Sequence, residues 1–275
     1  MHELETHPCF TARCSDYARI HLPVAPKCNI QCNYCLRKYS CVNESRPGVV
    51  ARVMEPEAAA EWYFEMKAKV PKLTVVGIAG PGDALANWPA VSKTLALIRK
   101  ADKDVFFCLS TNGLYLPRYA KEIAELGVDY VTVTVNALTS NTGAHIYSFV
   151  NDAGKKYVGQ EAAELLLNRQ LEGLQLLGSY GVKVKINTVA IPSVNMEELP
   201  AIARRMAVLG CKLHNILPML PVEGTAFAHL AEPEAQEIAA LREVCQQWMP
   251  QMRHCSRCRA DAVGTLEPAY CGEEQ

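Results

Sequence analysis

Three closely spaced cysteines carry the most specific chemistry in this sequence. Cys28, Cys32 and Cys35 form a C-x3-C-x2-C loop. Three thiolates with this spacing can each bind one iron of a [4Fe-4S] cube, which leaves the fourth iron open to a small chelating molecule. A structural zinc ion usually has four protein ligands instead. The loop therefore predicts an iron–sulfur cluster with one open position.

The remaining cysteines are concentrated at the two ends of the chain. Of the 12 cysteines, six fall within the first 41 residues and three within the last 21. The N-terminus lacks the basic-then-apolar pattern of a secretion signal, so we expect a cytoplasmic protein with reduced thiols. In that setting many cysteines are more often metal ligands than disulfides.

The composition is that of a packed protein with little net charge. Of 275 residues, 49% are hydrophobic and 21% charged, which excludes a mostly disordered chain. The 28 Lys and Arg residues nearly balance the 29 Asp and Glu residues, so no overall charge attracts nucleic acid or an acidic membrane. Because no apolar run approaches the length of a membrane span, we expect neither nucleic acid nor membrane as a partner.

The middle of the chain alternates β-rich runs with amphipathic stretches of helical length. Strands are predicted at 17–24, 73–79, 105–110, 129–135, 182–190 and 213–218. Each precedes a predicted helix, at 56–69, 88–101, 116–126, 160–178, 196–209 and 233–248. Six βα units predict an α/β fold whose parallel sheet closes partly into a barrel, with an open doubly wound sheet of five strands as the alternative.

We expect one domain, residues 1–275, with three parts. These are an N-terminal cluster-ligand segment at 1–16, the barrel at 17–220, and a C-terminal helix with a cysteine tail at 221–275. Segment 137–160 is long enough to be an active-site loop.

Polar motifs follow the predicted strands, at the ends where parallel α/β folds bind ligands. The three-cysteine loop follows the first strand. Successive later strands end in Gly80-Pro81-Gly82-Asp83, Ser110-Thr111-Asn112-Gly113, Asn136 and Asn187.

The cysteine loop resembles that of the radical S-adenosylmethionine (SAM) superfamily. The likeness lies in the spacing, in Tyr34 just before the third cysteine, and in the position after the first strand. It implies a (β/α)6 partial barrel in which Cys28, Cys32 and Cys35 are catalytic and hold a [4Fe-4S] cluster. SAM chelates the open iron, and one electron from the cluster cleaves SAM to give a 5′-deoxyadenosyl radical.

The same resemblance implies a set of SAM-contacting residues. Gly80, Gly82 and Asp83 match the Gly-rich segment that receives the methionyl amino group. The candidates for contact with the ribose or carboxylate are Ser110, Asn112 and Asn136, and turn or cap chemistry is the alternative for each. The superfamily's adenine motif is not apparent around 184–191.

Longer sequence segments around these motifs resemble one particular family within the superfamily. They are His7-Pro8-Cys9, the run from Ala25 to Cys35, Cys41, Asn43-Glu44-Ser45-Arg46-Pro47-Gly48, the Gly80 to Asp83 turn, and the tail from Cys255 to Gly264. Together they look like the NifB family of nitrogenase cofactor maturases. The chain ends soon after the resemblance does, so we expect a stand-alone form without the family's C-terminal carrier-like domain.

This resemblance implies that two auxiliary [4Fe-4S] clusters, K1 and K2, are fused with a carbide from the SAM methyl group and an added sulfur. The product, [8Fe-9S-C], is the precursor of the nitrogenase cofactor. The implied partners are SAM, iron–sulfur cluster donors, an electron donor, and the carrier and assembly scaffold proteins that receive the product.

Soft ligands for two further clusters are available, because thiolate and imidazole suit iron–sulfur sites. The family resemblance assigns His7, Cys9 and Cys41 to K1, and Cys108, Cys255 and Cys258 to K2. Four alternatives stay open: Cys14 in place of Cys9 or completing a ligand set, a surface or capping role for His7, an inert buried thiol at Cys108, and a zinc knuckle formed by Cys255 and Cys258 with His254 and Cys271. Cys211 and Cys245 are expected to pack in the core.

Besides a redox-neutral zinc-binding interaction module, two other functions remain open. One is a different radical SAM enzyme with auxiliary clusters, for example one that modifies a peptide or installs a thioether. This function does not explain the presence of His7-Pro8-Cys9. The other is a non-catalytic iron–sulfur carrier, which has no need for six βα units with polar strand ends.

Overall fold

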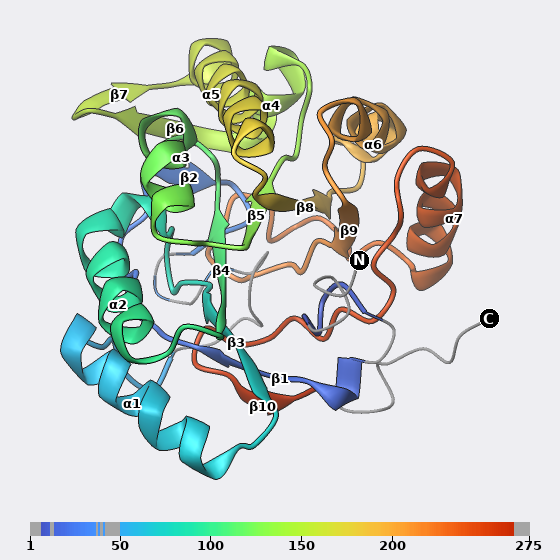
Figure 1. Cartoon of the computed structure of the whole chain (residues 1–275). Helices are drawn as coiled ribbons and strands as arrows, with labels where there is room; N and C mark the ends of the chain where they lie inside the picture. The colour runs from blue at the N-terminus through green and yellow to red at the C-terminus, as the bar shows by residue number, and fades with distance from the viewer. Residues whose placement is uncertain (1–6, 12–13, 37, 39–40, 42–49, 267–275) are drawn as a thin grey trace.

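A curved sheet forms the centre of the computed structural model, which describes residues 7–11, 14–36, 38, 41 and 50–266 (Figure 1). Six parallel strands lie in chain order across it: β1 (Ala18–His21), β3 (Leu73–Ile78), β4 (Phe106–Thr111), β5 (Tyr130–Thr134), β8 (Lys183–Ala190) and β9 (Leu213–Pro218). A doubly wound sheet reverses its strand order at a switch point, so that alternative is wrong. The predicted partial barrel is confirmed.

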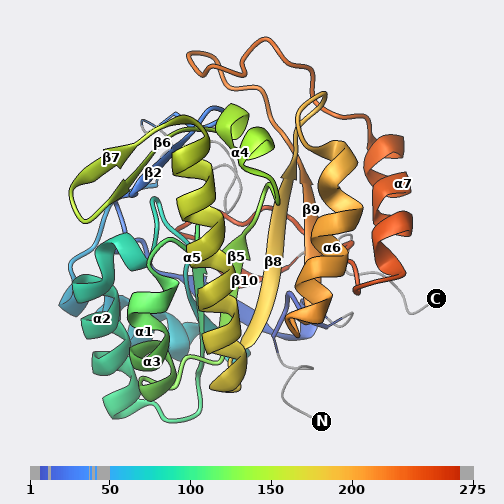
Figure 2. The same cartoon turned by 90° about the horizontal axis from the view of Figure 1, so that it is seen from above.

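The helices lie outside this sheet (Figures 1 and 2). They are α1 (Pro56–Lys69), α2 (Trp88–Ala101), α3 (Leu116–Glu125), α5 (Gly159–Ser179), α6 (Leu199–Val208) and α7 (Ala235–Gln246), close to the predicted ranges. Proline in the first turn begins α1, α2, α3 and α6, where its fixed φ suits a helix start. Gly127, Gly181 and Gly210 follow α3, α5 and α6 with φ of 68°, 76° and 79°, a conformation that glycine adopts without strain.

Side chains alternate between the two faces of the central strands. One set packs against the helices in the hydrophobic core, and on β4 and β5 it consists of Phe107, Leu109, Val131 and Val133. The other set faces the interior of the barrel, where Cys108, Ser110, Thr132 and Thr134 line cavities. The sheet thus separates an apolar layer from a polar interior.

The predicted active-site loop over 137–160 is wrong, because this segment holds α4 (Ser140–Ile146), β6 (Tyr147–Asp152) and β7 (Lys155–Tyr157). Thr139 Oγ1 caps α4 by accepting a hydrogen bond from the Thr142 amide at 3.1 Å. Ala153 and Gly154, with φ of 50° and 86°, make the tight turn between the two strands. The length that suggested a loop therefore reflects a short helix followed by a hairpin.

Short elements complete the described chain. β2 (Ile30–Cys32) pairs with β6 in a three-stranded sheet, and β10 (Val263–Thr265) pairs antiparallel with β1. The described residues also form the 3-10 helices η2 (Cys14–Asp16), η3 (Leu85–Asn87) and η4 (Met196–Glu198). Among the described residues, no helix has the length and apolar character needed to cross a membrane.

Candidate functional site

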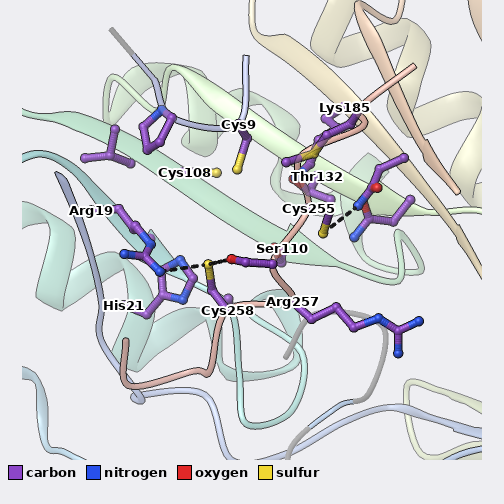
Figure 3. A pocket seen from close by; sticks show the side chains of 18 of the residues that line it. Cys9, Arg19, His21, Cys108, Ser110, Thr132, Lys185, Cys255, Arg257 and Cys258 are labelled. Atoms are coloured by element: carbon purple, nitrogen blue, oxygen red, sulfur yellow. Dashed lines mark hydrogen bonds between the residues drawn. The ribbon is translucent and has the colours of Figure 1, made fainter. Parts of the chain in front are cut away.

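Two adjoining cavities contain most of the predicted site residues. The loop cavity is lined by Cys28, Ile30, Cys32, Cys41, Gly82, Asp83, Ser110, Thr111, Asn112 and Thr134. The barrel cavity, shown in Figure 3, is lined by inward-facing strand residues, the N-terminal segment and the C-terminal tail. Ser110 lines both cavities, so they adjoin at this residue.

Pairing between β2 and β6 fixes the three-cysteine loop. Cys32 ends β2, and the amide of Asn33 continues the pairing by donating to the Ile146 carbonyl at 2.8 Å. The amide of Cys35 donates to the Cys32 carbonyl at 3.1 Å. Gln31 Nε2 donates to the same carbonyl at 2.9 Å and to that of Cys35 at 2.6 Å. The second and third cysteines are therefore held in a closed turn.

The Gly80 to Asp83 turn packs directly against the residues before Cys28. The Gly82 amide donates to the Ala25 carbonyl at 2.6 Å, and the Asp83 amide donates to the Lys27 carbonyl at 2.8 Å. A Cβ at Gly82 would lie 2.3 Å from the Lys27 carbonyl oxygen. Glycine is therefore required here by the close approach of two backbones.

The carboxylate of Asp83 is buried and hydrogen-bonded within the protein. It accepts from the amides of Leu85 at 2.9 Å, Ala86 at 3.1 Å and Asn112 at 2.6 Å, and from the Thr111 hydroxyl at 3.0 Å. Burial raises the pKa of Asp83, while these hydrogen bonds act in the opposite direction. Asp83 thus ties the turn after β3 to the turn after β4, and contact of its carboxylate with SAM stays a prediction.

Two asparagines hold the cysteine loop against the barrel. Asn112 Nδ2 donates to Asn29 Oδ1 at 2.6 Å and lies 3.8 Å from Cys28 Sγ. Asn136 Nδ2 donates to the hydroxyl of buried Tyr34 at 2.9 Å. Both side-chain amides therefore hold residues next to the cysteines, namely Asn29 and Tyr34. Contact of Asn112, Asn136 and Ser110 with SAM stays a prediction.

Four predicted thiol ligands meet in the barrel cavity. Cys9, Cys108, Cys255 and Cys258 come from three parts of the chain, and Figure 3 shows their sulfurs around one space. His7 lines the same cavity, and within the described structure its Nε2 is buried without a hydrogen-bond partner. Burial lowers the pKa of His7 well below its usual value, so the ring is neutral. Because His7 Nδ1 accepts a hydrogen bond from the Cys9 amide at 3.0 Å, the proton of the neutral ring is on Nε2, and iron ligation by His7 stays a prediction that requires exchange of this bond.

Two side chains donate to these sulfurs. Arg19 Nη2 donates to Cys258 Sγ at 3.0 Å, and Asn215 Nδ2 donates to Cys255 Sγ at 3.3 Å. Lys185 and Arg257 also line the cavity, whereas its described lining contains no carboxylate. Cationic groups and N–H donors around this cavity favour an anionic occupant.

The sequence-based site omits several polar residues of the barrel cavity, among them Arg19, His21, Lys185 and Asn215. Arg19 and His21 are two positions apart on β1, as are Lys185 and Asn187 on β8. Polar residues repeating with period two on otherwise apolar strands are the signal that identifies such inward-facing positions.

Two N-terminal cysteines lie away from the barrel cavity. Cys41 lines the loop cavity, and its amide donates to the Pro81 carbonyl at 3.1 Å, so the structure does not bring it together with His7 and Cys9. Cys14 is fully buried in η2 and disulfide-bonded, so it is not a free thiol.

The remaining candidates include packing residues and residues outside the described structure. Cys211 and Cys245 are buried in hydrophobic clusters, as predicted. His254 Nε2 lies 2.9 Å from the Pro8 carbonyl oxygen. Cys271 and segment 43–48 lie outside the described residues.

Within the described chain, no three His, Cys, Asp or Glu side chains form a site for a single metal ion. A [4Fe-4S] cube differs from such a site because its ligands bind separate irons. The spread of thiols around the barrel cavity therefore suits a cluster better than a single zinc ion.

Comparison with known proteins decides the family. Residues 22–206 match the Radical SAM superfamily. The chain belongs to this superfamily of enzymes. Membership implies a [4Fe-4S] cluster and SAM, as the cysteine loop predicted.

Similar proteins narrow this assignment. The chain is 47% identical over 268 residues to the FeMo cofactor biosynthesis protein NifB of Bradyrhizobium diazoefficiens, covering 96% of the chain and 54% of the relative. It is 44% identical over 265 residues to the protein of the same name from Chlorobaculum tepidum, covering 96% and 62%. The predicted similarity to NifB is confirmed, and the chain spans little more than half the length of these relatives.

Solved structures support the fold alone. Methylornithine synthase (PylB) superposes with a TM-score of 0.59 at 13% identity, covering 85% of this chain and 63% of that one. The structure of anSMEcpe with bound AdoMet gives a TM-score of 0.58 at 14% identity, covering 86% and 61%.

Proposed function

We propose that this radical SAM protein is a nitrogenase cofactor maturase. It fuses two [4Fe-4S] substrate clusters with a carbide from the SAM methyl group and an added sulfur into [8Fe-9S-C]. Two cubes supply eight irons and eight sulfides, the added sulfur is the ninth, and SAM supplies the carbon. The similarity to NifB proteins supports this reaction, and the observation that carries it is a thiol-rich barrel cavity adjoining the loop cavity at Ser110.

The loop cavity is assigned to SAM cleavage. When bound there, the [4Fe-4S] cluster supplies the electron that cleaves SAM. Cys28, Cys32 and Cys35 hold this cluster in the proposal. The residues proposed to surround SAM are Gly80, Gly82, Asp83, Ser110, Asn112 and Asn136.

The barrel cavity is assigned to the substrate clusters. In the proposal His7, Cys9, Cys108, Cys255 and Cys258 bind K1 and K2, and the proximity of these residues supports a shared site. Cys41 belongs to the same ligand set by resemblance, and its place in the loop cavity puts it on the side where SAM would bind.

One domain, residues 1–275, supplies all of these groups. The segments 1–16, 17–220 and 221–275 contribute ligands in turn, which explains why cysteines concentrate at both ends of the chain. The proposed partners are cytoplasmic cluster donors, an electron donor, and carrier and scaffold proteins that accept the product.

The test is an anaerobic reaction with methyl-labelled SAM. The protein is reconstituted with iron and sulfide and reduced, and 5′-deoxyadenosine, S-adenosylhomocysteine and cluster-bound label are measured together. Both nucleosides with retained label support maturation. 5′-Deoxyadenosine alone indicates another radical SAM reaction, and neither nucleoside from cluster-loaded protein indicates a carrier.

Two variants separate the assigned cavities. Cys32→Ala is expected to abolish SAM cleavage, because one of the three cluster thiolates is lost. Cys258→Ala should retain cleavage but yield no fused product. Cys211→Ala, which removes a buried thiol outside both cavities, is the matched control and should retain both activities. Equal loss of cleavage in Cys32→Ala and Cys258→Ala contradicts the division of labour.

A further inference from the structure

A buried side-chain amide in the three-cysteine loop has a donor that the described protein does not use. Asn29 directly follows Cys28, and only 8% of its surface is exposed. Within the described structure, Asn29 Nδ2 is buried without a hydrogen-bond partner. Buried polar groups in folded proteins are nearly always hydrogen-bonded, so this donor points to a ligand that binds in the loop.

A backbone amide fixes which end of the Asn29 side chain carries the donor. The amide of Leu114 donates to Asn112 Oδ1 at 2.9 Å, and a backbone N–H can only donate. The other end of the Asn112 side chain is therefore Nδ2, which donates to Asn29 Oδ1 at 2.6 Å. The oxygen of the Asn29 side chain is thus already bound, and its two N–H groups are the ones that remain for a ligand.

Further hydrogen bonds hold this pair of asparagines in place. The Asn112 amide donates to the buried carboxylate of Asp83 at 2.6 Å, and the Asn112 carbonyl accepts from Gln170 Nε2 at 2.7 Å. The Asn29 carbonyl accepts from the amide of Asn151 in β6 at 2.8 Å. The backbone and the side chain of Asn29 are both fixed, as a precisely placed donor requires.

The position of Asn29 favours an iron–sulfur cluster as the ligand. Asn112 Nδ2, which binds the Asn29 oxygen, also lies 3.8 Å from Cys28 Sγ, so the side-chain amide and the first cluster thiol share a neighbour. Asn29 does not line the loop cavity, where SAM would bind, and the same is true of Cys35. Hydrogen bonds to the sulfurs of a cluster help to set its reduction potential.

We propose that Asn29 Nδ2 donates a hydrogen bond to a sulfur of the [4Fe-4S] cluster held by Cys28, Cys32 and Cys35. The proposal rests on the proposed function, which assigns this cluster to the loop. An N–H group beside sulfur stabilises the reduced cluster, because that form carries more negative charge. Asn29 therefore raises the reduction potential of the cluster and helps to retain its iron.

The test detects asparagine nitrogen beside the cluster. A parent chain is labelled with ¹⁵N in its asparagine side-chain amides, reconstituted with iron and sulfide, and reduced without SAM. Pulsed electron paramagnetic resonance reports nitrogen coupled to the cluster, a redox titration gives the midpoint potential, and iron content is measured in parallel. The thiol ligands of the barrel cavity are removed in this parent by Cys9→Ala, Cys108→Ala, Cys255→Ala and Cys258→Ala.

Three substitutions in this parent locate the donor. Asn29→Asp keeps the oxygen that accepts from Asn112 and removes Nδ2, whereas Asn29→Leu removes the donor without adding charge. Asn33→Asp is the matched control in the same loop, because Asn33 Nδ2 already donates to the His145 carbonyl at 2.6 Å. Folding of each variant is checked by circular dichroism.

The expected result is an asparagine coupling that is present without SAM, is lost in both Asn29 variants and survives in Asn33→Asp. In the Asn29 variants the midpoint potential should become more negative, and iron retention against a chelator should fall about 10- to 100-fold. A coupling that survives both Asn29 variants, or one that appears only after SAM is added, overturns the proposal. A parent that holds the loop cluster without asparagine coupling refutes the Asn29 assignment alone, whereas a parent that takes up no iron contradicts the proposed function and the Asn29 assignment with it.

Discussion

Replacing Gly82 with alanine tests whether backbone packing positions the three-cysteine loop. The added Cβ would lie 2.3 Å from the Lys27 carbonyl oxygen and 2.8 Å from that of Pro26. Real Cβ atoms essentially never come within 3.0 Å of another heavy atom, so the two backbones must separate by about 0.7 Å. Because Lys27 precedes Cys28, this displacement passes directly to the first cluster thiol.

The expected losses of stability and of reaction rate follow from that displacement. Overpacking of this kind destabilises a protein by about 1–3 kcal/mol, so the chain should still fold. A misplacement approaching 1 Å costs up to about 100-fold in rate. We therefore expect Gly82→Ala to release 5′-deoxyadenosine from SAM about 100-fold more slowly, with less iron bound per chain.

Gly178→Ala provides the matched control. Gly178 lies near the end of α5, where the nearest atom to an added Cβ, the Leu209 carbonyl oxygen, is 3.9 Å away. Alanine there should raise helix stability by about 0.5–1 kcal/mol and leave SAM cleavage unchanged. Normal iron content and normal cleavage in Gly82→Ala would refute the argument that this close approach positions Cys28.

Two further predictions concern charge. Burial acts to raise the pKa of Asp102, but hydrogen bonds from Lys67 Nζ and the Tyr63 hydroxyl outweigh it and lower the pKa to about 2. A carboxyl group with a depressed pKa stabilises the fold above pH ~4, and this stabilisation is lost as the pH falls toward ~2. Asp102→Asn should therefore lower the free energy of unfolding at pH 7 by about 2 kcal/mol and make that free energy less dependent on acid pH in urea titrations. An equal dependence on pH in the variant and the parent protein contradicts this. Arg19→Gln removes the guanidinium donor to Cys258 Sγ and should weaken retention of the auxiliary clusters about 10- to 100-fold in a chelator titration. Unchanged retention counts against a role of Arg19 in holding these clusters.

The sequence predicts the barrel well because its signals are local. Apolar runs such as 73–79 and 129–135 have the length of buried strands, and prolines and glycines mark the helix ends between them. The spacing of Cys28, Cys32 and Cys35 is equally local, so the superfamily could be identified before the fold was known. Each of these predictions needed only residues that are close together in the chain.

The elements that the sequence misses depend on distant partners. β2 spans three residues and exists through its pairing with β6, more than a hundred residues later. β10 is likewise a three-residue strand that depends on pairing with β1. Segment 137–160 was misassigned because its length alone does not separate a long loop from a short helix followed by a hairpin.

The grouping of metal-site candidates shows the same limit. Cys9 and Cys41 are both N-terminal, yet one lines the barrel cavity and the other the loop cavity. Cys108 sits in an apolar run, but the alternation of β4 turns it inward with Ser110. Sequence reasoning identifies which residue types suit a cluster, and only the sheet decides which of them share one.

The two cavities are built in different ways, and this difference bears on the proposed reaction. The loop cavity rests on hydrogen-bonded turns that follow β3 and β4, which suits the precise placement of SAM. The barrel cavity is closed by the N-terminal segment and the tail, which contact each other through Pro8 and His254. Those segments carry Cys9, Cys255 and Cys258, so three of the proposed cluster ligands lie on the N-terminal segment and the tail rather than on the central strands. In the proposed function, SAM is therefore placed by turns anchored to the sheet, whereas most of the substrate-cluster ligands come from segments outside it.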